Sequence, residues 1–450
     1  MRTNTCTRSL GDVLSQFLTP QDWRQAHRAW RPKQAPSRWG LQALAWVALA
    51  MAWGTGNSQE ERFAAARAVY VACHQRQRRP GETLPGFLTA LARLPLGVLR
   101  ALAGALRRRW LGQFVEPLRL GPGGWVPLAC DGTRLECPRS QELQRRLGGV
   151  GKPGSAPMVY LTTLVLLPVA VPWAWRWGKG TAYEQDHLRR LLPTLPRRAL
   201  IVADAFFQGY DLFEAITRAG AGFLVRLSSR SHLYTPELVD LERFEQGLVY
   251  YWPKAAREAG RPPLLVRLLR VRGKKADVWL LTNVLERDEL GHQVAAQVYR
   301  WRWRNEGLFG AYKRQLAKAK LWGRTVRLVH REAEASLLAL ALVMAQAAQA
   351  VQRGATTVLI QGSPRRVLLR IRGAMQTDLR RLGPRQWRQY LAHLQRVQAG
   401  RREPSSCKVR QRWPRRSEHK PPKPPKIRVM DARFKALLEA ALRAAKERAC

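Results

Sequence analysis

Hydrophobic residues recur at spacings of three and four from the beginning of the chain to about residue 115, for example at 41–53, 61–75 and 86–111. This spacing predicts helices, which glycine and proline interrupt. We therefore expect a helical N-terminal domain over 1–115. The apolar segment 41–53 is shorter than the roughly 20 residues of a membrane span, so we interpret it as a buried helix and expect no membrane partner.

Beyond residue 120 the pattern changes to short apolar segments rich in β-branched and aromatic residues, which alternate with helical segments. The predicted order is three strands, a helix, a strand, a helix and a strand. These segments are 125–131, 158–167, 171–177, 182–193, 198–204, 210–220 and 222–229. This order is that of an α/β sandwich, in which catalytic groups lie at strand ends, and it assigns 116–229 to the first part of a core.

The next two regions complete this core. Short extended segments over 230–281 indicate a β-rich insertion. A long helix from about 290 to 320 and a second helix at 329–351 then place the second part of the core at 282–352.

The last region, 353–450, is basic. It contains the proline-rich segment 408–428, which is typical of an extended linker. It ends in an amphipathic helix at 432–447 that is suited to docking on another subunit.

The charge of the chain indicates its partner. There are 78 Lys and Arg against 32 Asp and Glu, which gives a net charge of +46. This excess requires a polyanion, and nucleic acid fits better than a membrane surface because the charge is spread over the whole length. The six cysteines form neither CxxC pairs nor the even clusters of a disulfide framework. We therefore expect a reducing cytoplasm and no zinc–thiolate site.

Four polar side chains share one helical spacing in the segment YRWRWRNEGLFGAYK. They lie at offsets of zero, three, seven and fourteen residues: Tyr299, Arg302, Glu306 and Lys313. On a helix of roughly 100° per residue they would line a stripe only about 60° wide. The spacing alone leaves open whether this stripe is an ordinary solvated helix face or a functional surface.

Two aspartates end predicted apolar strands: Asp131 follows VPLAC, and Asp204 follows ALIVA. Taken singly, an Asp at a strand end is more often a turn or cap residue. Together with Glu306, they provide three carboxylates from separate segments that this topology can bring together. Hard oxygen ligands suit two magnesium ions, one activating the attacking oxygen and one stabilising the leaving oxygen in phosphoryl transfer.

At these positions the chain resembles the DDE transposases of the insertion-sequence-four family, whose YREK signature is Tyr, two residues, Arg, three residues, Glu, six residues, Lys. All four signature positions match without a gap. The likeness covers about 120–350, because DGTRL at 131–135, VADAFF at 202–207, FLVRL at 223–227 and VWLLTN at 278–283 occur in the family's order. The resemblance implies an α/β, ribonuclease-H-like catalytic core with a β-rich insertion.

The resemblance also implies the metal site. Asp131, Asp204 and Glu306 would be the catalytic residues and would bind two Mg²⁺ ions, for which Mn²⁺ would substitute.

DNA-binding roles follow from the same resemblance. It implies that the helical domain over 1–115 recognises DNA ends and that the region 353–450 serves dimerisation or further DNA contact. Tyr299, Arg302 and Lys313 would contact DNA phosphates near the scissile bond. Arg226 would lie close to the transposon end, and Trp279 would stack on a base flipped out during hairpin formation. A buried strand position is the equal alternative for Trp279.

The activity implied is cut-and-paste transposition by a cytoplasmic, nucleoid-associated prokaryotic protein. Water nicks one strand, the freed 3′-hydroxyl forms a hairpin with the opposite strand, water opens the hairpin, and the new 3′-hydroxyl attacks target DNA. The partners would be double-stranded DNA, as terminal inverted repeats and target, and a second copy of the chain. Two alternatives remain: a metal-dependent endonuclease of the same fold, and a catalytically silent DNA-binding protein derived from a transposase. The intact acidic and signature positions argue against the second alternative.

Overall fold

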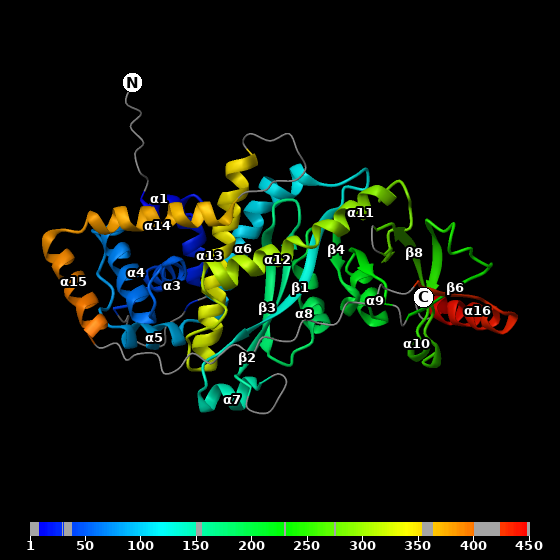
Figure 1. Ribbon diagram of the computed structural model, residues 1–450, viewed down its shortest axis with the longest axis horizontal. Coiled ribbons are helices and arrows are strands. Elements are labelled where there is room, and N and C mark those ends of the chain that lie inside the picture. Colours follow the sequence, from blue (N-terminus) through cyan, green and yellow to red (C-terminus); the bar gives the residue numbers. More distant parts are fainter. Residues whose placement is uncertain are drawn as a thin grey trace, which may run out of the picture.

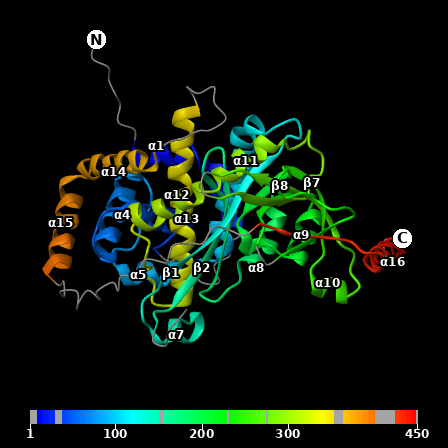
Figure 2. The same ribbon diagram turned by 45° about the vertical axis from the view of Figure 1, so that its right-hand side comes forward.

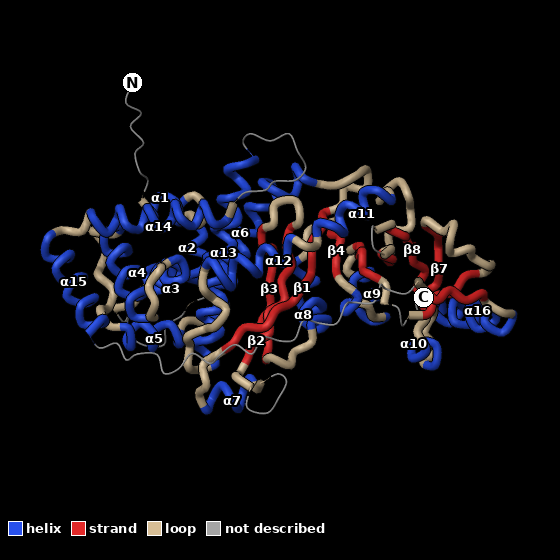
Figure 3. The backbone as a smooth tube through the Cα atoms, in the orientation of Figure 1, coloured by secondary structure: helices blue, strands red, loops and turns tan. Residues whose placement is uncertain are grey.

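The computed structural model describes residues 9–28, 30, 38–149, 155–228, 231–273, 276–352, 363–399 and 424–447. In this part of the chain the fold is mixed α/β, and its strands form a ten-stranded sheet in the order β10-β6-β7-β8-β9-β5-β4-β1-β2-β3. A helical region lies at one end of the molecule and the sheet extends away from it to the C-terminal helix (Figure 1). The separation of the helical end from the strands is clear in Figure 3.

Helices fill the described part of the region before the sheet. They are α1 (Leu10–Ser15), α2 (Pro20–Arg28), α3 (Leu41–Trp53), α4 (Gln59–Cys73), α5 (Leu84–Arg93) and α6 (Leu96–Trp110), followed by a π turn (Leu111–Val115) and a 3₁₀ turn (Glu116–Leu118). Ser58 caps α4, because its hydroxyl accepts the backbone N–H of Glu61. Every residue of α3 except Gln42 is buried, since α4 and α13 pack against it.

No single helix in the described part of the chain is long and apolar enough to cross a bilayer. The pair Leu84–Arg93 and Leu96–Leu118, bent by 77°, meets the criterion of length and composition only when both halves are joined.

Five strands form the core part of the sheet, with β4 and β5 parallel to β1 and with β2 and β3 antiparallel. These strands are β1 (Val126–Glu136), β2 (Met158–Leu166), β3 (Val171–Lys179), β4 (Ala199–Ala203) and β5 (Gly222–Arg226). The helices between them are α7 (Gln141–Leu147), α8 (Glu184–Leu191) and α9 (Tyr210–Arg218), with 3₁₀ turns at Leu192–Thr194 and Ala205–Phe207. Apart from α7, this is the order of elements that the hydrophobic pattern predicts.

The insertion continues the core sheet. Its elements are β6 (His232–Thr235), β7 (Gln246–Tyr251), α10 (Lys254–Glu258), β8 (Leu264–Val271) and β9 (Val278–Thr282). β9 pairs with β8 of the insertion and with β5 of the core. The insertion is therefore β-rich, and its strands are joined edge to edge with the core strands.

The C-terminal elements lie against the insertion of the same chain. β10 (Lys426–Val429) pairs with β6, and α16 (Ala432–Glu447) follows it. The ring of Phe434 stacks on Tyr234 with 4.4 Å between centroids. Docking of this helix on another subunit stays a prediction, since the structure contains one chain. Most of the predicted linker 408–428 lies outside the described residues.

The remaining helices are α11 (His292–Trp301), α12 (Arg304–Gly310), α13 (Val326–Gln352), α14 (Pro364–Arg380) and α15 (Pro384–Ala399), with a π turn (Ala311–Gln315) after α12. The single helix expected from about 290 to 320 is therefore broken at Arg302 and Trp303 and ends at Gln315. The break is a tightened turn, because the N–H groups of Arg302 and Asn305 each bond to the carbonyl three residues earlier.

Helix α13 connects the helical end to the sheet. It contacts α3 and α6 on one side and β3 on the other, and Figure 2 shows it crossing between the two regions. From Ala333 to Ala348 its residues are almost all buried. The large hydrophobic core is thus continuous from the N-terminal helices to the strands, while a second, smaller core lies between the sheet and α11.

Candidate active site

Asp131 and Asp204 lie on neighbouring parallel strands. β1 pairs with β4 so that Ala129 stands opposite Val202, and continuing this register by two positions places Asp131 opposite Asp204. Because alternate residues of a strand face the same side, Asp131 shares the face of Ala129. That face carries the small core in which α11 takes part. The structure therefore brings the two predicted aspartates together beside α11.

Arg226 extends the same row. β4 pairs with β5 so that Ala203 stands opposite Val225, and the next position aligns Asp204 with Arg226. Arg226 in turn stands opposite Leu280 of β9. Two carboxylates and one guanidinium thus occupy one row across three adjacent strands.

Glu306 comes from a helix that packs on β1. It is exposed in the first turn of this helix, α12. The pKa of Asp131 is raised to about 6, mainly by burial and further by the charges of Asp204 and Glu306. The N–H of Gly132 and the cation of Arg302 lower this pKa in part. All three predicted carboxylates therefore share one electrostatic environment.

The donor set fits a hard divalent cation, because carboxylate oxygens are the ligands that such cations prefer. A cation would also offset the charges of Asp204 and Glu306, which add to the effect of burial on the pKa of Asp131. Among the described residues, however, no three side chains of His, Cys, Asp or Glu are close enough in this arrangement to hold one ion. Buried atoms beside the row also lack hydrogen-bond partners within the described chain: Thr163 Oγ1, opposite Asp131 on β2, and Arg302 Nε. Buried polar atoms of this kind are expected where a ligand completes a site.

The turn between α11 and α12 divides the signature: Tyr299 lies on α11, Arg302 lies in the turn, and Glu306 and Lys313 follow it. Tyr299 is buried, whereas Trp303 is exposed, and the guanidinium of Arg302 lies over both rings at 5.6 and 5.1 Å from their centroids. Glu306 is exposed on the next helix. The four signature residues therefore do not lie along one straight helix, the arrangement that a continuous helix predicts, and Arg302 packs on Tyr299 and Trp303.

Lys313 returns to the sheet from the π turn after α12. Its Nζ donates to Oγ1 of Thr133 over 2.6 Å, and burial lowers its pKa. Thr133 lies two positions after Asp131 on β1 and so faces the same side. The structure thus places Lys313 next to the acidic row.

Trp279 is not part of this arrangement. It neighbours Leu280 on β9 and therefore points to the face opposite Arg226. Its side chain is buried against Phe244, at 5.8 Å between centroids, and under Arg270, at 5.4 Å. Its position is that of the buried strand residue, the alternative to base stacking.

Glu184, the first residue of α8, is an acidic residue that was not predicted as part of the site. The hydroxyl of Tyr160 donates to its carboxylate, and Gly132 leaves the space that this hydroxyl occupies. Burial raises the pKa of Glu184, and the charges of Asp204 and Asp131 raise it further. The only sequence signal was a Glu at the start of a predicted helix, where acidic residues are common for dipole reasons alone.

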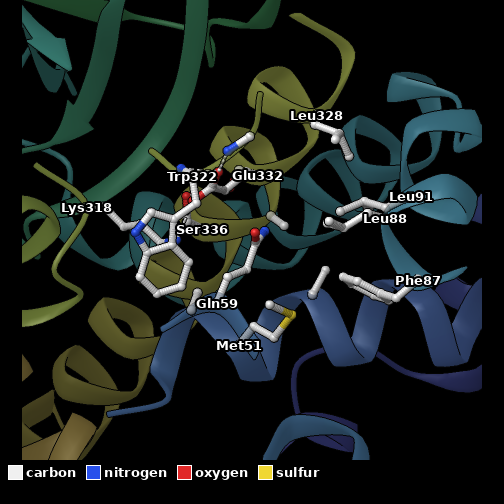
Figure 4. Close-up of a pocket in the computed structure, with 14 residues that line it drawn as sticks. Met51, Gln59, Phe87, Leu88, Leu91, Lys318, Trp322, Leu328, Glu332 and Ser336 are labelled. Carbon is white, nitrogen blue, oxygen red and sulfur yellow. Dashed lines mark hydrogen bonds and ion pairs between the residues drawn. The ribbon is translucent and has the colours of Figure 1, made fainter. Parts of the chain in front are cut away.

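The segment that follows the signature is anchored to α13. Glu332 accepts hydrogen bonds from Lys318 Nζ over 2.6 Å and from the backbone N–H groups of Trp322 and Gly323 over 2.8 Å. The ammonium group of Lys318 also lies 4.8 Å from the centre of the Trp322 ring. These residues line a small pocket between the N-terminal helices and α13 (Figure 4). This ion pair fixes the end of the segment that carries Lys313.

Comparison with known proteins gives three findings. The family model of the transposase DDE domain matches residues 126–344. Among solved structures, the chain is similar to the cryo-EM structure of a piggyBac transposase synaptic complex with hairpin DNA, with 10% sequence identity, coverage of 88% of this chain and 87% of that chain, and a TM-score of 0.44. No curated protein matches the chain. The matched segment contains Asp131, Asp204 and Glu306, and the match therefore supports a DDE transposase.

Proposed function

We propose that the chain is a cut-and-paste DNA transposase of the insertion-sequence-four type with a ribonuclease-H-like core. It cleaves transposon ends through a hairpin intermediate and joins them to target DNA. One observation carries the proposal: Asp131 and Asp204 align on adjacent parallel strands inside the segment that matches the transposase DDE domain. The charge of Glu306, in the same segment, contributes to the raised pKa of Asp131. The net charge of +46 supports DNA as the partner.

In this proposal the three acidic residues hold two divalent cations, Mg²⁺ or Mn²⁺. Bound cations would supply an ionised oxygen nucleophile and stabilise the charge on the leaving oxygen. The chain itself orients the carboxylates: the N–H of Gly132 donates to Asp131 over 2.8 Å, and the N–H of Phe206 donates to Asp204 over 2.9 Å. These bonds leave further oxygen lone pairs of both carboxylates available for ligands.

Three cations around the acidic row are proposed to hold the DNA backbone: Arg226, Arg302 and Lys313. They lie on β5, on the turn before α12 and on the π turn after it. Because Tyr299 is buried beneath Arg302, we propose that it acts on DNA by positioning that guanidinium. Stacking of Trp279 on a flipped base stays a prediction that its buried position does not favour.

We further propose that two copies of the chain hold the two transposon ends in one complex. Joining requires both ends at one target site, so a homodimer on DNA is the smallest assembly that serves. The protein would act in the prokaryotic cytoplasm on nucleoid DNA.

The test compares Asp204→Asn with Asp240→Asn in full-length protein. Asn keeps the size of the side chain but removes the charge, and Asp240 is an exposed residue of the insertion. Duplexes from the two flanks of the gene are incubated with protein and Mg²⁺, and nicks and hairpins are resolved on denaturing gels. Asp204→Asn should lose cleavage and keep DNA binding, while Asp240→Asn should retain both. Equal cleavage by the two variants would refute the assignment.

Strand transfer separates the proposal from an endonuclease of the same fold. A pre-cleaved end with a 3′-hydroxyl is mixed with supercoiled plasmid, protein and Mg²⁺. A transposase yields joined product, and an endonuclease cuts without joining. Absence of both cleavage and joining in the unmodified protein would favour a silent DNA-binding protein.

A further inference from the structure

Two arginines bind the backbone just after Lys313. Arg62 of α4 donates from Nη1 to the carbonyl of Leu316 over 3.4 Å. Arg372 of α14 donates from Nη2 to the carbonyl of Gln315 over 3.1 Å. Both carbonyls lie at the end of the π turn after α12, where helical geometry leaves carbonyls without a partner and cationic side chains are favoured. Arginines from two other helices thus hold the end of the signature segment.

The same two arginines bind a loop of the N-terminal helical region. Arg62 Nε donates to the carbonyl of Gly56 over 2.8 Å, and Arg372 Nε donates to the carbonyl of Trp53 over 2.8 Å. Trp53 is the last residue of α3, and Gly56 lies in the connection to α4. A Cβ on Gly56 would lie 3.2 Å from Cγ of Arg62, so this loop packs directly on the arginine stem. Each guanidinium therefore bridges two backbone segments, and we call Arg62 and Arg372 the arginine clamp.

The arginine clamp is shielded from solvent. Arg62 is 6% exposed, and Arg372 is half-buried. The Arg62 guanidinium also lies 4.8 Å from the centre of the Trp322 ring, which the ammonium of Lys318 contacts at the same distance. A guanidinium as buried as that of Arg62 has no surface to offer a DNA phosphate. Its effect on DNA would therefore pass through the backbone that it holds.

A strained residue follows the clamped carbonyls. Ala317 has a φ of 54°, in the left-handed region that is unfavourable for a residue with a Cβ. It lies between the clamped Leu316 and Lys318, which pairs with Glu332. Conformations of this kind persist where the surrounding structure fixes them. The arginine clamp and the ion pair thus fix the chain on both sides of this turn.

We propose that the arginine clamp positions Lys313 for its contact with DNA beside the acidic row. Lys313 lies two residues before the clamped Gln315, and its Nζ reaches Thr133 of β1 over 2.6 Å. The inference rests on the proposed function, which assigns Lys313 to the DNA backbone. The two arginines are positioning residues, because they act through the backbone of the signature segment. The helical end of the molecule thus sets the geometry of a site at the sheet.

The experiment is a double-mutant cycle in full-length protein between Arg62→Met and Lys313→Met. Methionine keeps an apolar stem against the loop and removes the guanidinium. Excess protein is mixed with Mg²⁺ and a labelled duplex from the gene's flank, and the rate constant of the first nick is measured. Arg62→Met should lower this rate constant by about 10- to 100-fold, since a misplacement of about 1 Å can cost this much. Once Lys313→Met is present, Arg62→Met should cost less than about twofold more, because no lysine is left to misplace.

Salt dependence gives a second reading that needs no cleavage. Because Arg62 is buried, Arg62→Met should lower the slope of log affinity against log salt only through Lys313, by about one. The slope should fall no further when Lys313→Met is added. Arg372→Met repeats both measurements from α14, so the test does not depend on the folding of one variant.

The matched control is Arg67→Met. Arg67 lies on the same helix as Arg62 and also donates to two backbone carbonyls, those of Pro80 and Gly81, in a loop of the N-terminal region. Its replacement should leave the nicking rate and the salt slope of the unmodified protein unchanged. Equal losses in Arg67→Met and the clamp variants would overturn the inference.

The remaining outcomes separate this inference from the proposed function. Equal rate losses from Arg62→Met with and without Lys313, unchanged rates in both clamp variants, or failure of both to fold would overturn the inference alone. If unmodified protein binds DNA without nicking it, the proposed function is wrong, and the salt slopes decide whether the clamp positions Lys313. If unmodified protein does not bind DNA, both are wrong.

Discussion

The substitution Glu332→Gln tests the ion pair that fixes the segment after the signature. The side chains of Glu332 and Lys318 are 12% and 5% exposed, and their charged atoms are 2.6 Å apart. Gln retains an oxygen that can accept the N–H groups of Trp322 and Gly323. The substitution therefore removes chiefly the charge that compensates the buried ammonium of Lys318.

The expected loss of unfolding free energy is about 3–5 kcal/mol, the usual result of removing one partner of a buried ion pair. Deprotonation of the orphaned ammonium at pH 7 sets an upper limit of about 5 kcal/mol. Adding Lys318→Met to Glu332→Gln should recover most of this loss, because the methionine side chain can pack over Trp322 without a charge. The double variant should lie within about 1 kcal/mol of the unmodified protein.

Urea unfolding followed by tryptophan fluorescence measures these differences as shifts of the transition midpoint at constant slope. The matched control is Glu258→Gln, which breaks an exposed pair with Lys254 on α10 and should cost less than about 0.5 kcal/mol. A loss below about 1 kcal/mol for Glu332→Gln would contradict the reasoning. So would a double variant as unstable as the single one.

Three further outcomes are expected. Burial lowers the pKa of His187 to about 4, so the unfolded state binds more protons than the folded state between pH 6.5 and 4. Acidification through this range should therefore lower the free energy of unfolding by up to about 3 kcal/mol. Urea unfolding at successive pH values should show a flatter dependence of this free energy on pH for His187→Gln. Gly132→Ala places a methyl group against the hydroxyl of Tyr160 and should cost about 1–3 kcal/mol; Tyr160→Phe in the same protein should restore part of this stability, and no restoration would argue against the clash. Lys313→Met should reduce the slope of log affinity against log salt by about one, as measured by fluorescence anisotropy on duplex DNA; an unchanged slope would exclude a phosphate contact.

The position of the acidic row could be predicted from local sequence. Asp131 and Asp204 each follow an unbroken apolar run, and such runs become neighbouring buried strands whose ends meet. The predicted order of elements was then sufficient to place the helix that carries Glu306 on the same strands. The break at Arg302 could not be predicted in this way, because the residues on both sides of it keep helical spacing.

Long-range pairing explains what the sequence left undetermined. The face on which Trp279 lies depends on the register between β5 and β9, and a shift of one residue would reverse it. The pairing of β10 with β6 joins segments nearly two hundred residues apart, and nothing in either segment specifies the other. Glu184 joined the acidic region because α8 packs beside β1, a tertiary contact with no local signal.

Strand β9 limits how this protein can be shortened. Its backbone bonds to β5 on one side and to β8 on the other, so the insertion is not a detachable module. Removal of 231–273 would leave β9 with an open edge on which other chains could add. A minimal version of the protein would have to keep the β8–β9 hairpin. It would also have to keep the connection between β6 and β7, because the carbonyls of Leu241 and Glu242 accept hydrogen bonds from Arg270.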